Sequence, residues 1–115
     1  SEVDEVLTIE QLHQLQRYVA TIEVTEKLRG YIVSLGNKTR QHSAVHIGLS
    51  PRGLLMWQRL AQAHAYMANR SFVTPDDVQA VAQPALSVRL TGDFDSADSL
   101  VDEVLANVQI PWSDK

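Results

Sequence analysis

Apolar residues recur at the spacing of an α-helix along most of this chain, most clearly between residues 26 and 40. Side chains suited to burial fall there at i, i+3, i+4, i+7 and i+11: Leu28, Tyr31, Ile32, Leu35 and Thr39. Thr25 stands directly before the segment and is a good N-cap. The pattern predicts an amphipathic helix over 26–40, which Gly30 and Gly36 weaken but do not break.

A longer helix is predicted over residues 51–69. Ser50 is a good N-cap, and Pro51 suits the first helical position, where its missing N–H costs nothing. On a helical wheel the apolar side chains cover roughly 200°, which is wider than a surface helix needs. They are Leu54, Met56, Trp57, Leu60, Ala61, Ala63, Ala65, Met67 and Ala68. We therefore expect this helix at the centre of the core.

Shorter elements flank these two helices. Thr8 and Gln11 fit a capping box before a short helix, and the β-branched stretch 19–25 fits an extended connector. Thr74 should cap a further helix with Pro75 at its first position.

Pro84 should end or kink that helix, and 85–90 fits one more helical turn. Residues 92–95 fit a loop, after which Ser96 begins a last helix that Pro111 stops. No segment has the strong alternation of a strand. The fold class is all-α, a small bundle of about five helices.

Composition fits one folded domain over residues 1–115. The chain is 44% hydrophobic and 21% charged, with a net charge of −4. This acidic balance argues against a nucleic-acid or membrane surface. The absence of cysteine excludes disulfides and thiolate chemistry. With no signal peptide visible we expect a cytoplasmic protein, and a first residue Ser1 in place of Met suggests a processed chain or an excised fragment.

Arg52 is the first candidate for function. A cation in the first turn of a helix lies at the unfavourable end of the helix dipole. An exposed helix N-terminus together with a guanidinium is, however, a good anion site. We weigh a phosphate-contacting arginine equally against a solvated surface arginine.

The acidic candidates have simpler explanations. Asp76 and Asp77 could be paired catalytic carboxylates, but their position in the first turn of a helix favours charge complementarity. Asp93, Asp95 and Asp98 lack the turn glycine and closing glutamate of an EF-hand, so a solvated acidic loop is favoured over a calcium site.

Histidine and aromatic candidates also favour structural roles. His42 and His46 have a ligand-like spacing without a convincing third ligand. His64, within the apolar arc of the long helix, is expected to be packed and hydrogen-bonded. Tyr31 and Leu35 could form an apolar wall for a base, although core packing is favoured.

Five separated elements together resemble the C-terminal lid domain of MoxR-type AAA+ ATPases. They are Thr39-Arg40, Gly48-Leu49-Ser50-Pro51-Arg52, the alanine-rich helix to Asn69-Arg70, Phe72-Val73-Thr74-Pro75-Asp76-Asp77-Val78, and Pro84-Ala85-Leu86-Ser87-Val88-Arg89-Leu90. The likeness extends from about Val6 to Pro111. Ser87-Val88-Arg89 departs from the family, which often has a histidine before the arginine. The chain has no phosphate-cradling glycine loop of its own.

The resemblance implies a helical lid over a separate nucleotide-binding core of the same chain, which would bind ATP and Mg²⁺. Ser-Pro-Arg carries the sensor-2 arginine in this family. Arg52 would then contact the γ-phosphate, with Ser50, Pro51 and Tyr31 as further candidates at the nucleotide. The family forms hexameric rings of chaperone-like motors, often with von Willebrand A-domain partners.

A stand-alone helical module that binds a protein partner is the alternative function. Trp57 and the wide apolar arc of the long helix would then provide the binding face. A small-molecule enzyme is less favoured, because no nucleophile–base or acid–base pair can be placed in the sequence.

Overall fold

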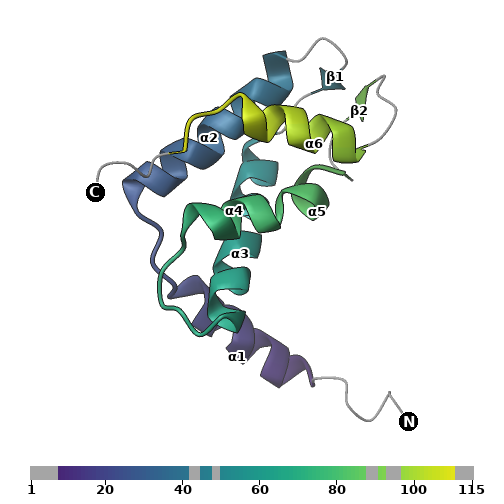
Figure 1. Cartoon of the computed structure of the whole chain (residues 1–115). Coiled ribbons are helices and arrows are strands. Elements are labelled where there is room, and N and C mark those ends of the chain that lie inside the picture. Colours follow the sequence, from purple (N-terminus) through teal and green to yellow (C-terminus); the bar gives the residue numbers. More distant parts are fainter. Residues whose placement is uncertain (1–7, 42–44, 48–49, 88–90, 93–96, 111–115) are drawn as a thin grey trace.

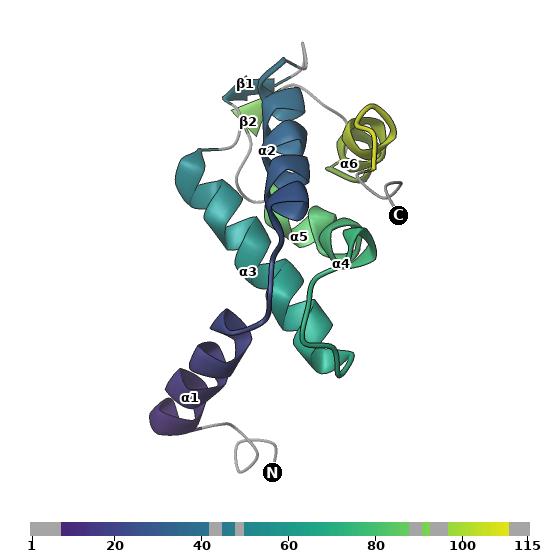
Figure 2. The same ribbon diagram turned by 90° about the vertical axis from the view of Figure 1, so that its left-hand side faces the viewer.

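The computed structural model describes residues 8–41, 45–47, 50–87, 91–92 and 97–110. This part of the chain forms, in order, α1 (Ile9–Ala20), α2 (Glu26–Gln41), β1 (Val45–Ile47), α3 (Pro51–Met67), α4 (Pro75–Ala80), α5 (Ala82–Ser87), β2 (Thr91–Gly92) and α6 (Ala97–Ala106). Helix α3 runs through the middle, with α4 and α5 against it (Figure 1). Helices α2 and α6 lie side by side at one end, and α1 projects at the other (Figure 2).

Helix α2 confirms the most regular pattern in the sequence. All five residues of its predicted stripe are buried, and the backbone N–H of Leu28 donates to Thr25 Oγ1 at 3.3 Å. Gly36 is also buried. A Cβ at this position would lie 2.5 Å from Leu54 Cδ2 of α3, so a larger residue would require Leu54 to move. The glycine therefore lets α2 and α3 approach closely.

Helix α3 is central to the core, as predicted, but its apolar arc is only partly buried. Trp57, Ala61 and Ala65 have no exposed surface, and the Trp57 indole N–H donates to the Val78 carbonyl at 2.9 Å. Met67, in contrast, is 76% exposed. The apolar arc therefore has two environments: one part faces the core, and the other faces α1 and solvent.

The end of α3 is a Schellman motif. Ala68 is the C-cap, and Asn69 follows in the left-handed region at φ 64°. The N–H of Asn69 donates to the Tyr66 carbonyl at 3.0 Å, and that of Arg70 donates to the Ala65 carbonyl at 2.9 Å. The helix thus ends two residues before the predicted boundary, and the chain turns back sharply at Arg70.

The break caused by Pro84 comes earlier than the proline itself. Helix α4 ends at Ala80, the residue whose carbonyl would bond to the N–H that Pro84 lacks. The chain resumes as α5 at Ala82, which places Pro84 in the first turn, where no N–H is needed. This split raises the number of described helices to six. The predicted turn at 85–90 is therefore α5, and residues 88–90 lie outside the described part.

Two extended features accompany the helices. Strands β1 and β2 pair antiparallel through Val45 with Gly92 and Ile47 with Thr91, which the sequence did not predict. The predicted connector after α1 does contain extended chain. Glu23 N–H donates to the Ser71 carbonyl, and Val73 N–H donates to the Glu23 carbonyl, both at 2.9 Å.

Helix α1 agrees with its prediction, whereas α6 ends at Ala106, before Pro111, which was expected to stop it. Thr8 and Gln11 form the expected capping box, with both bonds at 3.0 Å, yet α1 contains no buried residue. Val101 and Val104 of α6 are buried, whereas Ser96 and Pro111 lie outside the described residues. None of the helices described here combines the length and apolar character needed to cross a bilayer.

Candidate functional site

Arg52 lies in the first turn of α3 and is exposed. That turn contains no acidic residue, and among the described residues the Arg52 side chain has no hydrogen-bond or ion-pair partner. A guanidinium beside the positive end of a helix dipole is unfavourable for folding alone. The same arrangement is complementary to a phosphate or carboxylate.

Ser50 and Pro51 shape this helix start. The Ser50 hydroxyl accepts from the Gly53 N–H at 3.1 Å, and its carbonyl accepts from the Leu54 N–H at 2.9 Å. Pro51 occupies the first helical position. Both residues thereby fix the start of α3, and contact of either with a nucleotide stays a prediction.

Tyr31 and Leu35 belong to the core. Tyr31 is only 3% exposed, and its hydroxyl accepts from Gln79 Nε2 at 3.0 Å, while Leu35 is fully buried. The ring of Tyr31 thus offers no open face to a base in this structure. The arrangement favours core packing over an adenine wall, and we do not include Tyr31 in the proposed site.

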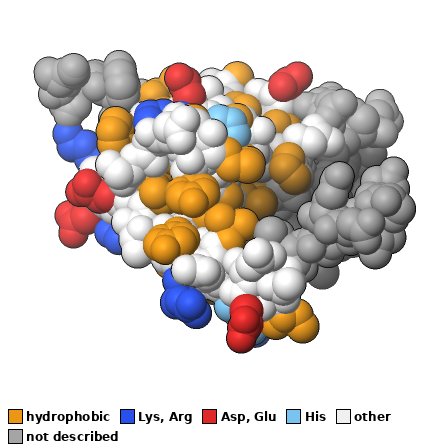
Figure 3. Space-filling view, turned by 90° about the horizontal axis from the view of Figure 1, so that it is seen from below, with side chains coloured by type: hydrophobic (Ala, Val, Ile, Leu, Met, Phe, Trp, Pro, Cys, Tyr) orange, Lys and Arg blue, Asp and Glu red, His pale blue; other side chains and the backbone are white. Residues whose placement is uncertain are grey.

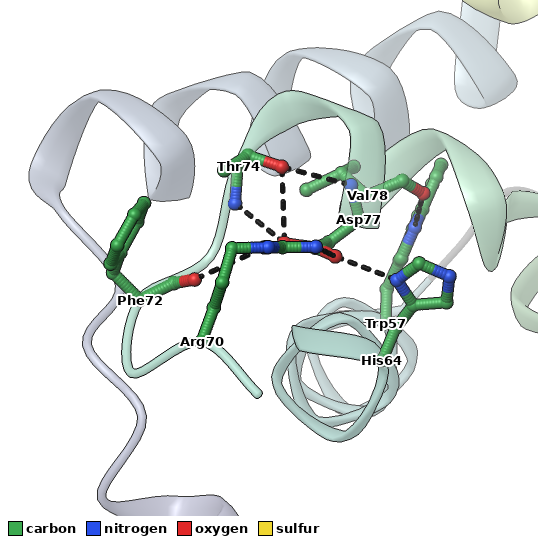
Figure 4. Close-up of polar contacts among 7 residues, drawn as sticks. All are labelled: Trp57, His64, Arg70, Phe72, Thr74, Asp77 and Val78. Atoms are coloured by element: carbon green, nitrogen blue, oxygen red, sulfur yellow. Dashed lines mark hydrogen bonds and ion pairs between the residues drawn. The ribbon is translucent and has the colours of Figure 1, made fainter. Parts of the chain in front are cut away.

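A second cluster joins the end of α3 to the start of α4 around the buried carboxylate of Asp77 (Figure 4). Arg70 donates from Nη1 to Oδ2 at 2.5 Å and from Nη2 to Oδ1 at 2.8 Å. His64 Nδ1 lies 2.6 Å from Oδ1. Thr74 donates to Oδ2 from its N–H at 2.7 Å and from its hydroxyl at 3.1 Å. We call His64, Arg70, Thr74 and Asp77 the Asp77 network.

The partners of Asp77 keep its carboxylate ionised. Burial alone would raise the pKa of Asp77, but hydrogen bonds from Arg70, Thr74 and His64 outweigh that effect and hold the pKa well below its usual range. The hydrogen bond with Asp77 in turn raises the pKa of Arg70. The ion pair is bidentate and one partner is fully desolvated, which distinguishes it from an ordinary surface pair.

The Asp77 network supports a structural role over a catalytic one. Among the described residues, the His64 imidazole has no hydrogen-bond partner other than Asp77, so no nucleophile adjoins this ring. Asp76 is exposed while Asp77 is buried, so the two do not form a carboxylate pair. The predicted N-terminal role of Asp77 holds, since it completes a capping box with Thr74.

The sequence predicted a packed, hydrogen-bonded His64. The hydrogen bond is present, but the His64 side chain is 41% exposed, and the role of Arg70 was missed. One available signal was Asn69, a residue that tolerates the left-handed conformation and so permits a sharp turn after a helix. The turn directs Arg70 toward the next helix start, where an acidic residue at the third position was already expected. Together these features indicate a bridge between the two helices.

Other sequence candidates are not assembled into a site. His42, Asp93 and Asp95 lie outside the described residues, and the side chains of His46 and Asp98 are not described. Within the described part of the chain, no three His, Cys, Asp or Glu residues cluster as metal ligands. Trp57 is fully buried, so the predicted binding face of the alternative function cannot include it.

Comparisons with known proteins give a consistent assignment. The model of the AAA lid domain family matches residues 37–107, more than half of the chain. The Bacillus subtilis (strain 168) protein YeaC, described as uncharacterized, is 34% identical over 95% of this chain and 36% of its own length. A crystal structure of a protein from Cytophaga hutchinsonii, provisionally described as an ATPase, matches with a TM-score of 0.79 at 23% identity.

The structural match covers 88% of this chain and 35% of the other, so this chain spans about a third of the length of both relatives. At this identity the structural match shows the fold, and the family model shows the membership. The chain therefore belongs to the AAA lid domain family, the C-terminal helical lids of AAA+ ATPases.

Proposed function

We propose that this chain is the lid of a MoxR-type AAA+ ATPase and that Arg52 senses the γ-phosphate of ATP bound to a core in the same polypeptide. The observation that carries the proposal is the exposed guanidinium in the first turn of α3, without a partner among the described residues. The local residues fit a phosphate, because charge and helix dipole both favour an anion there.

Arg52 would act by binding one nucleotide state better than the other. Its guanidinium can donate charge-assisted hydrogen bonds to a terminal phosphate. When bound to the core, ATP with Mg²⁺ supplies the phosphoryl group that is transferred to water. After hydrolysis the contact is lost, so the preference of the lid for one orientation changes.

The lid can carry such a change as a rigid unit. Arg52 lies at one end of α3 and the Asp77 network at the other, where it fixes α3 to α4. Trp57 joins the same two helices between these points. A movement at Arg52 would therefore move α3 and α4 together, toward neighbouring subunits of a hexameric ring. Chaperone-like remodelling, with a von Willebrand A-domain partner, is the activity that we propose for such a ring.

The test is ATPase turnover of the full-length protein with Arg52→Ala. We expect a loss of at least about tenfold in kcat, since an arginine that contacts the transferred phosphoryl group contributes strongly to the transition state. Arg52→Lys should keep part of the activity, because it retains the charge but loses the bidentate geometry. Nucleotide affinity should be measured in the same samples.

Arg29→Ala is the matched control, since Arg29 is exposed on α2 and has no side-chain partner among the described residues. It should leave turnover unchanged. If Arg52→Ala leaves both turnover and ATP affinity at the wild-type values, Arg52 is a surface residue and the nucleotide-sensing role is wrong.

A further inference from the structure

Residues of helices α1 and α3 line an open groove of about 670 Å³. Arg52, Ser50 and Pro51 of the proposed nucleotide site are not part of this lining. Its apolar wall residues are Leu15, Val19 and Ala20 of α1, and Met56, Leu60 and Ala63 of α3. His13, Gln16, Arg17 and Arg59 complete the lining. Figure 3 looks onto the end of the molecule where α1 lies and shows hydrophobic side chains gathered at its centre.

Apolar side chains of both helices are exposed. Met56, in the lining of the groove, is 39% exposed, and Ile9 and Leu12, on α1 outside this lining, are 71% and 43% exposed. Apolar side chains gathered in one groove, as in this lining, mark sites of protein interaction more often than isolated exposed residues do. The groove extends over residues 13–20 and 56–63, about 10 Å along each helix, which suits two to three turns of a partner helix.

The charges around the groove indicate which partner fits. Arg17 stands on the α1 wall and Arg59 on the α3 wall, and the lining contains no acidic residue. Helix α3 has no Asp or Glu at all, although the whole chain has a net charge of −4. The local positive charge therefore runs against the charge of the molecule, which favours an acidic partner.

Arg59 is also held in place. Its Nη1 donates to Gln62 Oε1 at 3.0 Å, and the buried Gln62 donates from Nε2 to the Ile22 carbonyl at 2.7 Å. A guanidinium positioned before binding loses less side-chain freedom when a carboxylate arrives. The positive charge of Arg59 is thus held at the edge of the groove by hydrogen bonds within the folded protein.

We propose that the α1–α3 groove binds an amphipathic helix of a partner protein, with an apolar ridge flanked on both sides by Asp or Glu. The ridge lies between Leu15, Val19, Met56 and Leu60, and the acidic flanks meet Arg17 and Arg59. This inference does not depend on the role of Arg52.

The test uses the 115-residue chain and three fluorescent helical peptides of about 14 residues, roughly four turns. The first has a leucine ridge with glutamate flanks, the second has the same ridge with lysine flanks, and the third has glutamate flanks with serine in place of leucine. Fluorescence anisotropy should show binding of the first peptide only. Amide shifts in NMR spectra should map this binding to α1 and α3.

Charge reversal provides the decisive comparison. Arg17→Glu and Arg59→Glu should together weaken binding of the glutamate-flanked peptide by about tenfold or more, since attraction becomes repulsion at two positions. The same double variant should gain binding of the lysine-flanked peptide, which also shows that it is folded. Arg29→Glu, an equal change of charge on α2, should alter neither affinity.

Three results would overturn the proposal. Binding of none of the peptides would show that the groove is not a helix site. Equal binding of the first two peptides would show an apolar patch without charge preference. Concentration-dependent dimerisation in analytical ultracentrifugation, abolished by Met56→Glu, would identify a second copy of this chain as the occupant in place of an acidic partner.

Discussion

At the scale of single residues, two arginines of this lid have opposite environments. Arg52 is exposed and has no partner among the described residues, whereas Arg70 forms a bidentate ion pair with the fully buried Asp77. The guanidinium of Arg70 is already committed, so a role in folding accounts for it. A cation at position 52 does not help the helix to fold, because it lies at the positive end of the helix dipole. A bound anion would account for its presence. The local environment, and not the residue type, thus separates a candidate binding residue from a structural one.

The Asp77 network can be tested by removing one partner. Arg70→Met should lower the free energy of unfolding, because the buried carboxylate then loses its counter-charge. The double variant Arg70→Met with Asp77→Asn should recover part of that loss, since no unpaired charge remains. Urea denaturation followed by circular dichroism at neutral pH measures both values.

Asp76→Asn is the control for this experiment. Asp76 lies in the same helical turn but is exposed, so its replacement should cost no more than about 1 kcal/mol through the helix dipole. A similar small cost for Arg70→Met would mean that the ion pair contributes little to stability.

At the scale of the elements, the two glycines of α2 have different surroundings. A Cβ at Gly30 would meet no atom within 4 Å, whereas one at Gly36 would lie 2.5 Å from Leu54 Cδ2. Both glycines lower the helix propensity of α2. Only Gly36 has a packing reason to be small, since it allows α2 to approach α3.

Alanine substitution should therefore have opposite effects at these positions. Gly30→Ala should stabilise the protein by about 0.5–1 kcal/mol, because alanine favours the helix and restricts the unfolded chain. Gly36→Ala should destabilise it, since displacing a packed side chain costs about 1–3 kcal/mol and exceeds the gain in propensity. Thermal unfolding of the two variants side by side provides the comparison, and equal stabilisation would show that Leu54 moves away freely.

The sequence predicted what local patterns determine. The stripe of α2 and the caps at Thr8, Ser50 and Thr74 are all confirmed, because each depends on residues within one or two turns. The pairing of β1 with β2 and the Asp77 network depend on contacts across loops, which hydrophobic periodicity does not record. The Arg52 site was predicted from the local conflict between its charge and the helix dipole, and its nucleotide role stays a prediction.

At the scale of the whole molecule, the lid divides into a well-packed part and a less buried one. Within the described residues, helices α2 to α6 supply most of the buried hydrophobic side chains and the connecting segments supply Ile22, Val24 and Val73, while α1 supplies none. The Asp77 network lies in the packed part and joins its central helix to α4. A change in the ionisation of Asp77 should therefore affect the stability of the domain as a whole, and not only the local turn.

Acid should reveal this coupling. Because the pKa of Asp77 is lowered in the folded state, its ionised form stabilises the protein above the unfolded pKa of about 4. As pH falls below that value, the unfolded chain takes up a proton that the folded protein does not. The free energy of unfolding should then decrease by up to about 1.4 kcal/mol per pH unit through this one group.

Urea denaturation at pH 7, 5, 4 and 3 measures the effect against Asp77→Asn, which lacks the titrating group. His64, Arg70 and Thr74 face the same carboxylate, so the comparison should be repeated with His64→Gln in both proteins to separate the effect of Asp77 from that of the imidazole. We expect the stability advantage of the parent over the Asp77→Asn variant to be constant between pH 7 and 5 and to shrink below pH 4. An advantage that stays constant down to pH 3 would mean that the pKa of Asp77 is the same in the folded and the unfolded protein. The Asp77 network would then not stabilise the ionised carboxylate.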